Sequence, residues 1–261
     1  MKKTVFLLLI AGAAFTACKK DKNNGGQPNI TKYITKMTEK DAEGLETTID
    51  FTWNAKNQLV TLTDSDGPTR TFTYDGAGRL IKQKMENGDE SEEYTFTYTA
   101  AGLPEKYVRR SVDGNGDEGV FNGVYTITDG KVSKIFEKDT DPESGHETYV
   151  EFGYAANNLA TVTAVAGNNG TQDPVTKAVI TLTHGSKRNP AAAMQLKYAL
   201  TSELAIEAYS ANEIKTLTMK FLGNTLTSTT TYEYDAAGFP TSSQTKEEDS
   251  DDVTKTTYQY K

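Results

Sequence analysis

Aromatic and polar side chains alternate along the chain with the period of a β-strand. In residues 92–98, aromatic side chains fill every second position from Tyr94, and Glu or Thr fills the positions between. Successive strand residues point to opposite faces of a sheet, so the rings share one face and the polar groups share the other. The alternation continues through residues 179–184 and 215–221. It predicts antiparallel strands with one apolar face.

This strand pattern belongs to a repeat that runs the length of the chain. Each copy has an aromatic-x-aromatic segment, a short turn rich in Gly or Asn, and an apolar residue that starts the next strand. The period of roughly 21 to 29 residues is typical of repeat architectures, and the turn residues favour consecutive hairpins. The copies are residues 51–59, 72–80, 96–104, 152–159 and 232–240, with degraded copies at 125–132 and 209–214 and a partial unit at 256–260.

The repeat predicts a single all-β domain over residues 30–261. We expect a large antiparallel meander of about sixteen strands, strongly curved or barrel-like, with open and closed forms both allowed. Residues 186–203 interrupt the alternation. Because Asn189-Pro190 is a typical helix start, a short helix or plug is expected near residues 190–200.

The N-terminus has the pattern of a bacterial lipoprotein export signal. Two lysines precede an apolar run, residues 5–15, that is too short to span a bilayer. Residues 15–18, Phe-Thr-Ala-Cys, have the shape of a lipobox, in which small residues precede the cysteine that receives the lipid. We therefore predict a signal peptide at residues 1–17 and lipid attachment at Cys18. Because Phe15 departs from the usual leucine, cleavage by an ordinary signal peptidase and a plain anchor stay as alternatives.

A polar segment rich in Lys, Asn and Gly occupies residues 18–29. It cannot bury apolar surface, so we expect a flexible tether between the lipid and the folded domain. Its Cys-Lys-Lys-Asp start resembles lipoproteins of Bacteroides-type bacteria, and this resemblance implies export to the outer membrane, with periplasmic and surface orientations both open.

The turn sequence also resembles a known repeat. Residues 74–80, Tyr-Asp-Gly-Ala-Gly-Arg-Leu, resemble the YD repeat of Rhs and teneurin shells, and residues 234–238 are a second near match. With the lipobox, the chain resembles uncharacterised Bacteroides-type surface lipoproteins that have a porin-like domain of degenerate repeats. The resemblance covers residues 30–261. It implies a curved or closed antiparallel sheet and brings no catalytic residue with it.

Composition narrows the choice of partner. Removing residues 1–17 deletes two lysines and no acids, so the formal charge changes from −8 to −10. This acidic balance argues against nucleic acid and against electrostatic adhesion to anionic lipid. Cys18 is the only cysteine, which excludes a disulfide within the chain and a cysteine-ligated zinc.

One segment has part of a metal-binding pattern. Asp113, Asn115 and Asp117 are spaced like the first ligands of a calcium loop. The sixth position is Glu118 where glycine is needed, and the twelfth is Val124 where an acid is needed. The three residues are therefore candidate ligands only, an acidic hairpin turn is the favoured interpretation, and no cofactor is predicted.

No catalytic motif occurs. Serine-nucleophile, zinc-protease and phosphate-loop patterns are all missing from the sequence, and His146 and His184 have no acid at ligand spacing. Trp53 and the tyrosines fit either a sugar-stacking platform or a packed core, and the core is favoured because every repeat fills these positions. The chain is therefore not expected to be an enzyme.

These observations support one hypothesis and two alternatives. The hypothesis is a non-catalytic, lipid-anchored cell-envelope protein, a surface binding or scaffolding module whose partner is a glycan or an envelope protein. One alternative is a surface hydrolase acting on glycans, with acids brought together from distant strands. The other is an integral β-barrel, which is disfavoured because the outward face would mix Tyr with Lys and Glu and because mean hydropathy is −0.59.

Overall fold

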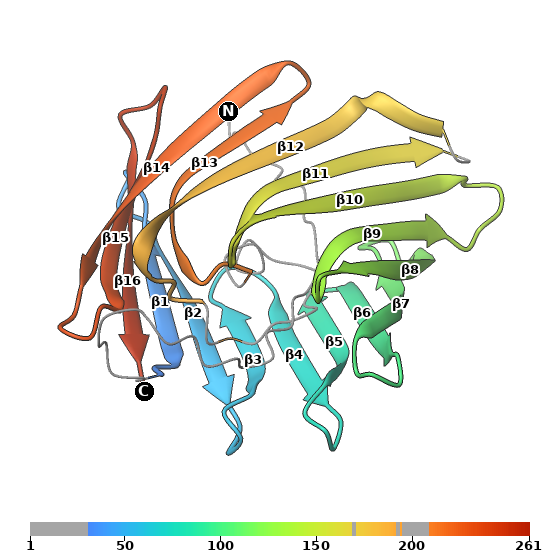
Figure 1. Cartoon of the computed structure of the whole chain (residues 1–261), viewed down its shortest axis with the longest axis horizontal. Coiled ribbons are helices and arrows are strands. Elements are labelled where there is room, and N and C mark those ends of the chain that lie inside the picture. The colour runs from blue at the N-terminus through green and yellow to red at the C-terminus, as the bar shows by residue number, and fades with distance from the viewer. Residues whose placement is uncertain (1–30, 169–170, 192–193, 195–208) are drawn as a thin grey trace.

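The computed structural model describes residues 31–168, 171–191, 194 and 209–261. Sixteen antiparallel strands form a closed barrel in which each strand pairs with its neighbours in sequence and β1 pairs with β16 (Figure 1). This confirms the all-β meander and selects the closed form. The strands are β1 (Ile34–Lys40), β2 (Glu46–Trp53), β3 (Leu59–Asp64), β4 (Thr69–Tyr74), β5 (Leu80–Asn87), β6 (Glu90–Tyr98), β7 (Pro104–Val112), β8 (Glu118–Thr128), β9 (Lys131–Asp139), β10 (His146–Ala155), β11 (Asn158–Asn168), β12 (Thr171–Arg188), β13 (Asn212–Phe221), β14 (Asn224–Tyr234), β15 (Pro240–Glu247) and β16 (Val253–Tyr260).

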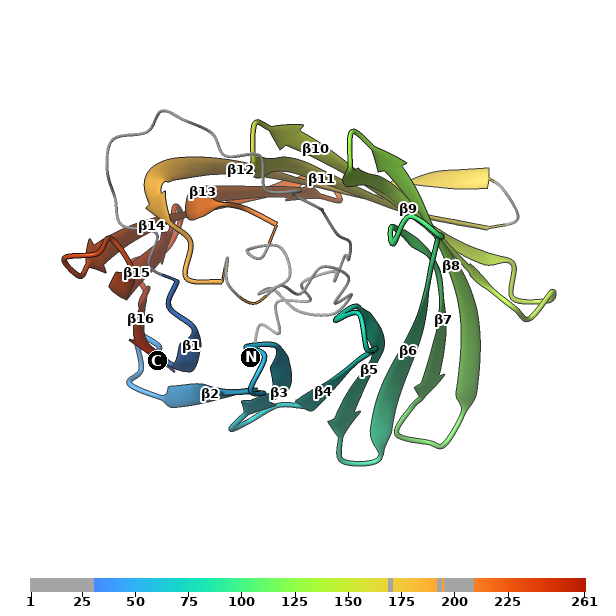
Figure 2. The ribbon, with the colours of Figure 1, turned by 60° about the horizontal axis from the view of Figure 1, so that its bottom comes forward.

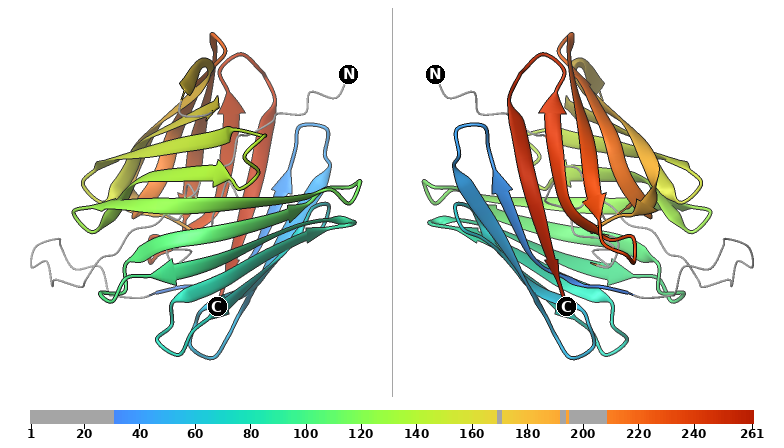
Figure 3. Two further views of the ribbon diagram at one scale, coloured as in Figure 1. Left: turned by 90° about the vertical axis from the view of Figure 1, so that its right-hand side faces the viewer. Right: turned by 90° about the vertical axis from the view of Figure 1, so that its left-hand side faces the viewer.

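The seam of the barrel joins the two ends of the described chain. Met37 of β1 pairs with Tyr258 of β16, and the backbone of Tyr33 exchanges hydrogen bonds with that of Lys261. Figure 3 shows β16 lying beside β1. Tyr33, Lys261 and the repeat turns lie at the same end of the barrel, which we call the basal end. We call the opposite end the apical end.

Part of the sequence prediction lies outside the described residues. This applies to the signal peptide and tether and to most of the helix expected near residues 190–200. At its predicted start, the Asn189 side chain accepts a hydrogen bond from the Ala191 amide, and Met194 N–H donates to the Ala191 carbonyl. The described ranges contain no α-helix. Within them, no helix is long and apolar enough to cross a membrane.

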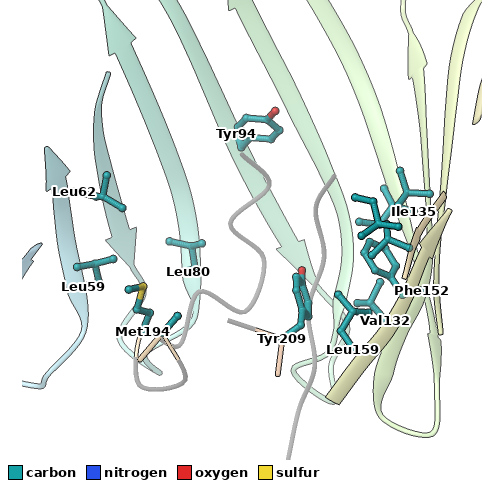
Figure 4. Packing of buried hydrophobic residues seen from close by; sticks show 14 of the residues in the cluster. Leu59, Leu62, Leu80, Tyr94, Val132, Ile135, Phe152, Leu159, Met194 and Tyr209 are labelled. Carbon is teal, nitrogen blue, oxygen red and sulfur yellow. The ribbon is translucent and has the colours of Figure 1, made fainter. Parts of the chain in front are cut away.

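The hydrophobic core fills the barrel. Phe51, Leu62 and Phe72 alternate with outward threonines on β2 to β4, and each is at least 95 % buried. Met194 and Tyr209, from the segment between β12 and β13, lie inside the ring of strands among these side chains (Figures 2 and 4). Their position inside the ring fits the predicted plug.

A β-bulge follows each repeat turn. The register shifts between Thr73 and Tyr74, so one extra residue of β5 lies opposite this step. As a result Leu80 and Gln83, three positions apart, are both buried. Strict two-residue alternation therefore fails at this point of every unit. The same shift occurs at Trp53, Tyr98, Ile127, Tyr154 and Tyr234.

The basal turns share one hydrogen-bonding scheme. In the turn that starts at Asp75, the carboxylate accepts hydrogen bonds from the amides of Ala77 and Arg79, at 2.9 Å each. These backbone hydrogen bonds lower the pKa of Asp75. Gly78 takes the left-handed conformation, with φ of 83°, that glycine adopts without strain. Equivalent turns start at Asn54, Thr99 and Asp235.

The second aromatic residue of a unit ties two strands together at the basal end. The Tyr74 hydroxyl donates to the Leu59 carbonyl at 2.8 Å, beyond the last paired residues of β3 and β4. Burial raises the pKa of Tyr74. This contact explains why the repeat keeps a Tyr or Trp at this position. The same kind of bond joins Trp53 to Ile34, Tyr98 to Leu80 and Tyr260 to Pro240. In the unit at residues 232–240 the first aromatic residue, Tyr232, makes it instead, to the Ile214 carbonyl.

The outer face of the barrel is mainly polar. Threonines and charged residues alternate with the inward rings, and ion pairs such as Lys82–Glu93, at 2.9 Å, connect neighbouring strands. Others are Lys36–Asp50 and Lys134–Glu151. A short apolar row interrupts this face, where the rings of Phe136 and Tyr149 lie 4.8 Å apart.

We expect Tyr74→Phe to lower the free energy of unfolding by about 1 kcal/mol, because the buried Leu59 carbonyl loses its donor. Urea denaturation followed by circular dichroism measures this change. Tyr33→Phe is the control, since no hydrogen bond from its hydroxyl is seen among the described residues and its loss should leave the midpoint unchanged. Equal midpoints for the two variants would show that the repeated bond is not stabilising.

The buried tyrosines predict loss of stability in alkali. Burial raises the pKa values of Tyr94, Tyr107 and Tyr125 well above the ordinary tyrosine value of 10.0. Because the folded pKa exceeds the unfolded one, their contribution is complete below about pH 10 and is lost as the pH rises further. Tyrosinate absorbance and circular dichroism should therefore change together in an alkaline titration. Ionisation of all fourteen tyrosines with the barrel still folded would contradict the prediction, and Tyr125→Phe should make the pH dependence less steep.

Candidate functional site

A charged cluster interrupts the apolar lining on one side of the barrel. We call it the inner wall and define it as Arg70, Glu92, Arg109, Phe121 and Glu137. These residues come from β4, β6, β7, β8 and β9. Four of them lie two positions from a core residue of their own strand, and Phe121 lies four positions from Tyr125, so strand geometry directs all five inward. The strands thus bring together charges that are far apart in sequence.

Arg109 is the centre of the inner wall. Its guanidinium donates Nε and Nη2 to the Glu137 carboxylate, at 3.1 and 2.7 Å, and Nη1 to Glu92 at 3.2 Å. Its Cζ lies 3.8 Å from the centre of the Phe121 ring. Burial disfavours the charge, but the hydrogen bonds and charge of Glu137 outweigh it and raise the pKa of Arg109. Arg109 is therefore fixed in place as a permanent cation.

Tyr107 extends this network below Arg109. Its ring lies across Gly123 of β8, where a Cβ would be only 2.0 Å from the ring. The Tyr107 hydroxyl thereby reaches Glu137 on β9 and donates at 2.9 Å. Glycine at this position thus allows the ring to pass over one strand and bind the next.

Arg70 differs from Arg109 because no described residue forms a hydrogen bond or ion pair with it. It faces inward between Leu62 and Met85, and its Nε is buried without a hydrogen-bond partner. Burial lowers the pKa of Arg70, although the charges of Asp64 and Glu92 oppose the change. A largely buried guanidinium without a close acceptor is unfavourable for folding. Such a group is well suited to bind an acceptor on a ligand.

The inner wall can be reached by solvent, whereas the basal lining cannot. The side chains of Arg109, Glu137 and Glu92 are 16 %, 14 % and 23 % exposed. Leu59 and Val132, which point inward at the basal end, are 0 % exposed. Among the described inward residues, those at the basal end are therefore closely packed, and those of the inner wall, toward the apical end, keep part of their exposure.

The tyrosine-rich part of the interior is packed. The ring centres of Tyr94 and Tyr107 are 5.7 Å apart, those of Tyr107 and Tyr125 are 5.5 Å apart, and all three side chains are buried. Trp53 lies at the basal end, edge-on to Tyr33. These rings therefore form core and rim, and they leave no open stacking platform of the kind considered from the sequence.

The predicted site residues lie elsewhere. Asp113 starts the apical turn between β7 and β8, and its Oδ1 accepts hydrogen bonds from the amides of Asn115 and Asp117 at 2.9 and 3.0 Å. This is the scheme of the Asp75 turn, so it supplies a structural role for the pattern. Among the described residues, no group of three or more His, Cys, Asp or Glu is placed to hold a metal ion. Cys18 lies outside the described residues.

A second polar cluster surrounds His184 near the basal end. His184 Nε2 lies 2.9 Å from Ser210 Oγ, which accepts the Leu159 amide hydrogen. The buried Glu213 carboxylate accepts hydrogen bonds from the Lys187 amide and the Tyr234 hydroxyl. Burial lowers the pKa of His184. Because Ser210 is 2 % exposed, the cluster stabilises the irregular pairing of β12 and β13 rather than presenting a nucleophile.

The inner-wall charges have a recognisable spacing in the sequence. Arg70, Glu92, Arg109 and Glu137 are each two residues from an apolar inward residue, namely Phe72, Tyr94, Tyr107 and Ile135. A charged residue an even number of positions from a core residue on the same strand has its side chain on the inner face. The neighbouring Glu93 is out of phase with the core, and its side chain lies on the outer face.

Comparisons with known proteins agree with the geometry. The RHS Repeat family model matches residues 53–90, which span two basal turns. A porin-like protein from Bacteroides vulgatus ATCC 8482 aligns with a TM-score of 0.56 at 11 % identity, over 88 % of this chain and 99 % of that one. A porin-like protein from Bacteroides uniformis ATCC 8492 aligns with a TM-score of 0.52 at 17 % identity, over 87 % and 96 %. No curated protein matches the sequence. The predicted resemblance is thus confirmed at the level of fold, and the chain has a closed sixteen-strand barrel similar to that of Bacteroides porin-like proteins.

Proposed function

We propose that this protein is a lipid-anchored, non-catalytic β-barrel of the cell envelope that binds a glycan on its inner wall. The observation that carries the proposal is Arg70, an inward, largely buried guanidinium without a hydrogen bond or ion pair in the described structure. The lipobox at Cys18 supports the envelope location. The likeness to two Bacteroides porin-like proteins is consistent with it.

The chemistry of the inner wall suits a ligand with many hydroxyl groups. A sugar hydroxyl both donates and accepts hydrogen bonds. The wall carries Arg70, Glu92, Arg109 and Glu137 in turn on β4, β6, β7 and β9, so donors and acceptors alternate along it. Since Arg109 is already held by two carboxylates, it needs little ordering when a ligand binds.

The outer face favours a barrel in water over one in lipid. Lipid-facing strands carry apolar outward residues, and charges there are costly. In this barrel the outward positions carry threonines and pairs such as Lys82–Glu93 and Lys134–Glu151. An anchor at Cys18 would then hold an otherwise water-soluble domain at the membrane.

Arg70→Gln should weaken glycan binding at least about tenfold, because a hydrogen bond to a charged group contributes about 1.5–3 kcal/mol. A broad glycan array with the mature protein carrying Cys18→Ser would identify the sugar, and titration calorimetry would measure affinity. Lys84→Gln is the matched control, because Lys84 lies on the outer face of the neighbouring strand β5. Equal affinity for Arg70→Gln and wild type would refute this use of the inner wall, and so would absence of binding on the array.

A glycan hydrolase is a second candidate, because two carboxylates, Glu92 and Glu137, converge on one guanidinium. Glycoside hydrolysis needs such a pair. Under our proposal, the wild-type protein releases no new reducing ends from the glycan it binds. Release that disappears in both Glu92→Gln and Glu137→Gln, with binding retained, would establish the hydrolase and overturn the non-catalytic assignment.

A further inference from the structure

The two ends of the barrel differ in charge. The described apical turns contain twelve acidic residues and no lysine or arginine. The basal turns and the strand ends beside them do contain lysine and arginine, and several of these side chains lie beside aromatic rings. The apical acids are Asp41, Glu43, Asp66, Asp89, Asp113, Asp117, Asp141, Glu143, Glu248, Asp249, Asp251 and Asp252.

Basic side chains cover aromatic rings around the basal end, and we call this set the basal rim. Arg79 lies 4.9 Å from the centre of the Tyr98 ring, and Lys131 lies 4.9 Å from that of Tyr154. The Asp residues of the basal turns are largely engaged, since Asp75 pairs with Arg79 and Asp235 with Lys32. Further pairs are Lys32 with Phe239 and Tyr260, Arg188 with Phe239, Lys215 with Tyr232 and Tyr234, and Lys261 with Tyr33 and Trp53.

This combination fits the surface of a lipid bilayer. Tyr and Trp are enriched where apolar and aqueous phases meet, because one part of each ring is apolar and another is polar. Lys and Arg place their charged ends at the phosphates of the headgroups and are attracted by anionic lipid. The basal rim presents both kinds of side chain in a ring around one end of the barrel.

The chain enters the barrel at this same end. The backbone of Tyr33 pairs with that of Lys261 beside Trp53. Residues 18–30 separate the predicted lipid attachment site from this point. The flexible tether expected for this segment would span about 20 Å on average. The anchor would therefore keep the basal rim close to the headgroups.

We propose that the basal rim rests on the phosphate-bearing headgroup surface of the membrane that holds the anchor. This orientation directs the acidic apical turns away from the membrane. The proposal depends on the lipid anchor of the proposed function. It also refines the inference from net charge, since in a chain that is acidic overall the described apical turns carry acids without basic residues, while basic residues gather at the basal end. An anionic surface attracts the first end and repels the second.

Energy transfer from tryptophan to dansyl-labelled lipid tests the orientation, because Trp53 is the only tryptophan and lies in the basal rim. The lipidated protein would be placed in vesicles of equal parts phosphatidylcholine and phosphatidylglycerol with a trace of dansyl-phosphatidylethanolamine. We expect strong transfer from Trp53. The double variant Trp53→Phe, Leu45→Trp carries its only tryptophan in an exposed apical turn and should show several-fold weaker transfer. Equal or reversed transfer overturns the proposal.

Charge variants test the role of the basic side chains. Lys56→Gln, Lys131→Gln and Lys261→Gln together should reduce transfer from Trp53, and added salt should do the same in the wild type. The matched control, Lys84→Gln, Lys134→Gln and Lys246→Gln, removes the same charge from the outer face and the apical half and should leave transfer unchanged. Equal effects of both triple variants contradict the proposal.

Vesicle flotation distinguishes failure of the proposed orientation from failure of the lipid anchor. If the protein floats with vesicles but transfer does not depend on the position of the tryptophan, the anchor holds and the orientation is wrong. If Cys18→Ser and the wild type made in the same cells both stay at the bottom of the gradient, the anchor itself is wrong and the orientation fails with it.

Discussion

Closure of the sheet between β1 and β16 is the constraint on which the rest of this structure depends. An open meander of this length would leave two edges with unpaired backbone groups. Pairing Met37 with Tyr258 satisfies those groups and forces the rings of every strand to meet in one enclosed core. Closure also places both ends of the described chain at the basal end, where the tether would begin. The core and the inner wall follow from this one pairing, and the proposed orientation of the barrel depends on it.

Much of the fold could be predicted from the sequence because its signals are local. Alternation within a strand places the Tyr94 and Phe96 rings on one face, and each turn contains the residue that its conformation requires. The bulge could not be predicted, since it depends on pairing between strands. It directs Leu80 and Gln83 to the same side, which a strict two-residue period places on opposite sides. The YD-like repeat is therefore a unit of turn, bulge and aromatic hydrogen bond, and the aromatic residue is the part that sequence most readily reveals.

The inner wall depends on long-range register, and this is why it was missed. Arg109 and Glu137 are separated by β8 and meet across that strand, and Gly123 lets the Tyr107 ring cross the same strand to reach Glu137. Sequence spacing alone cannot predict such a contact. The Asp113 pattern shows why the acidic turn was the favoured interpretation, because a spacing that suggests a metal is also the spacing of a backbone cap. Local patterns predicted the turns of this barrel well and its chemistry poorly.

The asymmetry of the barrel also bears on which ligands can reach the inner wall. Solvent access lies toward the apical end, where the turns carry acids and no basic residue in the described chain. A polyanionic ligand would be repelled at this entrance even though Arg70 is available inside. A neutral sugar meets no such barrier, and its hydroxyl groups can accept from Arg70 while donating to Glu92. The same charges that keep the apical end away from an anionic membrane would therefore select for uncharged ligands. Recognition and orientation would then share one physical cause, the separation of acidic and basic residues between the two ends of a closed sheet.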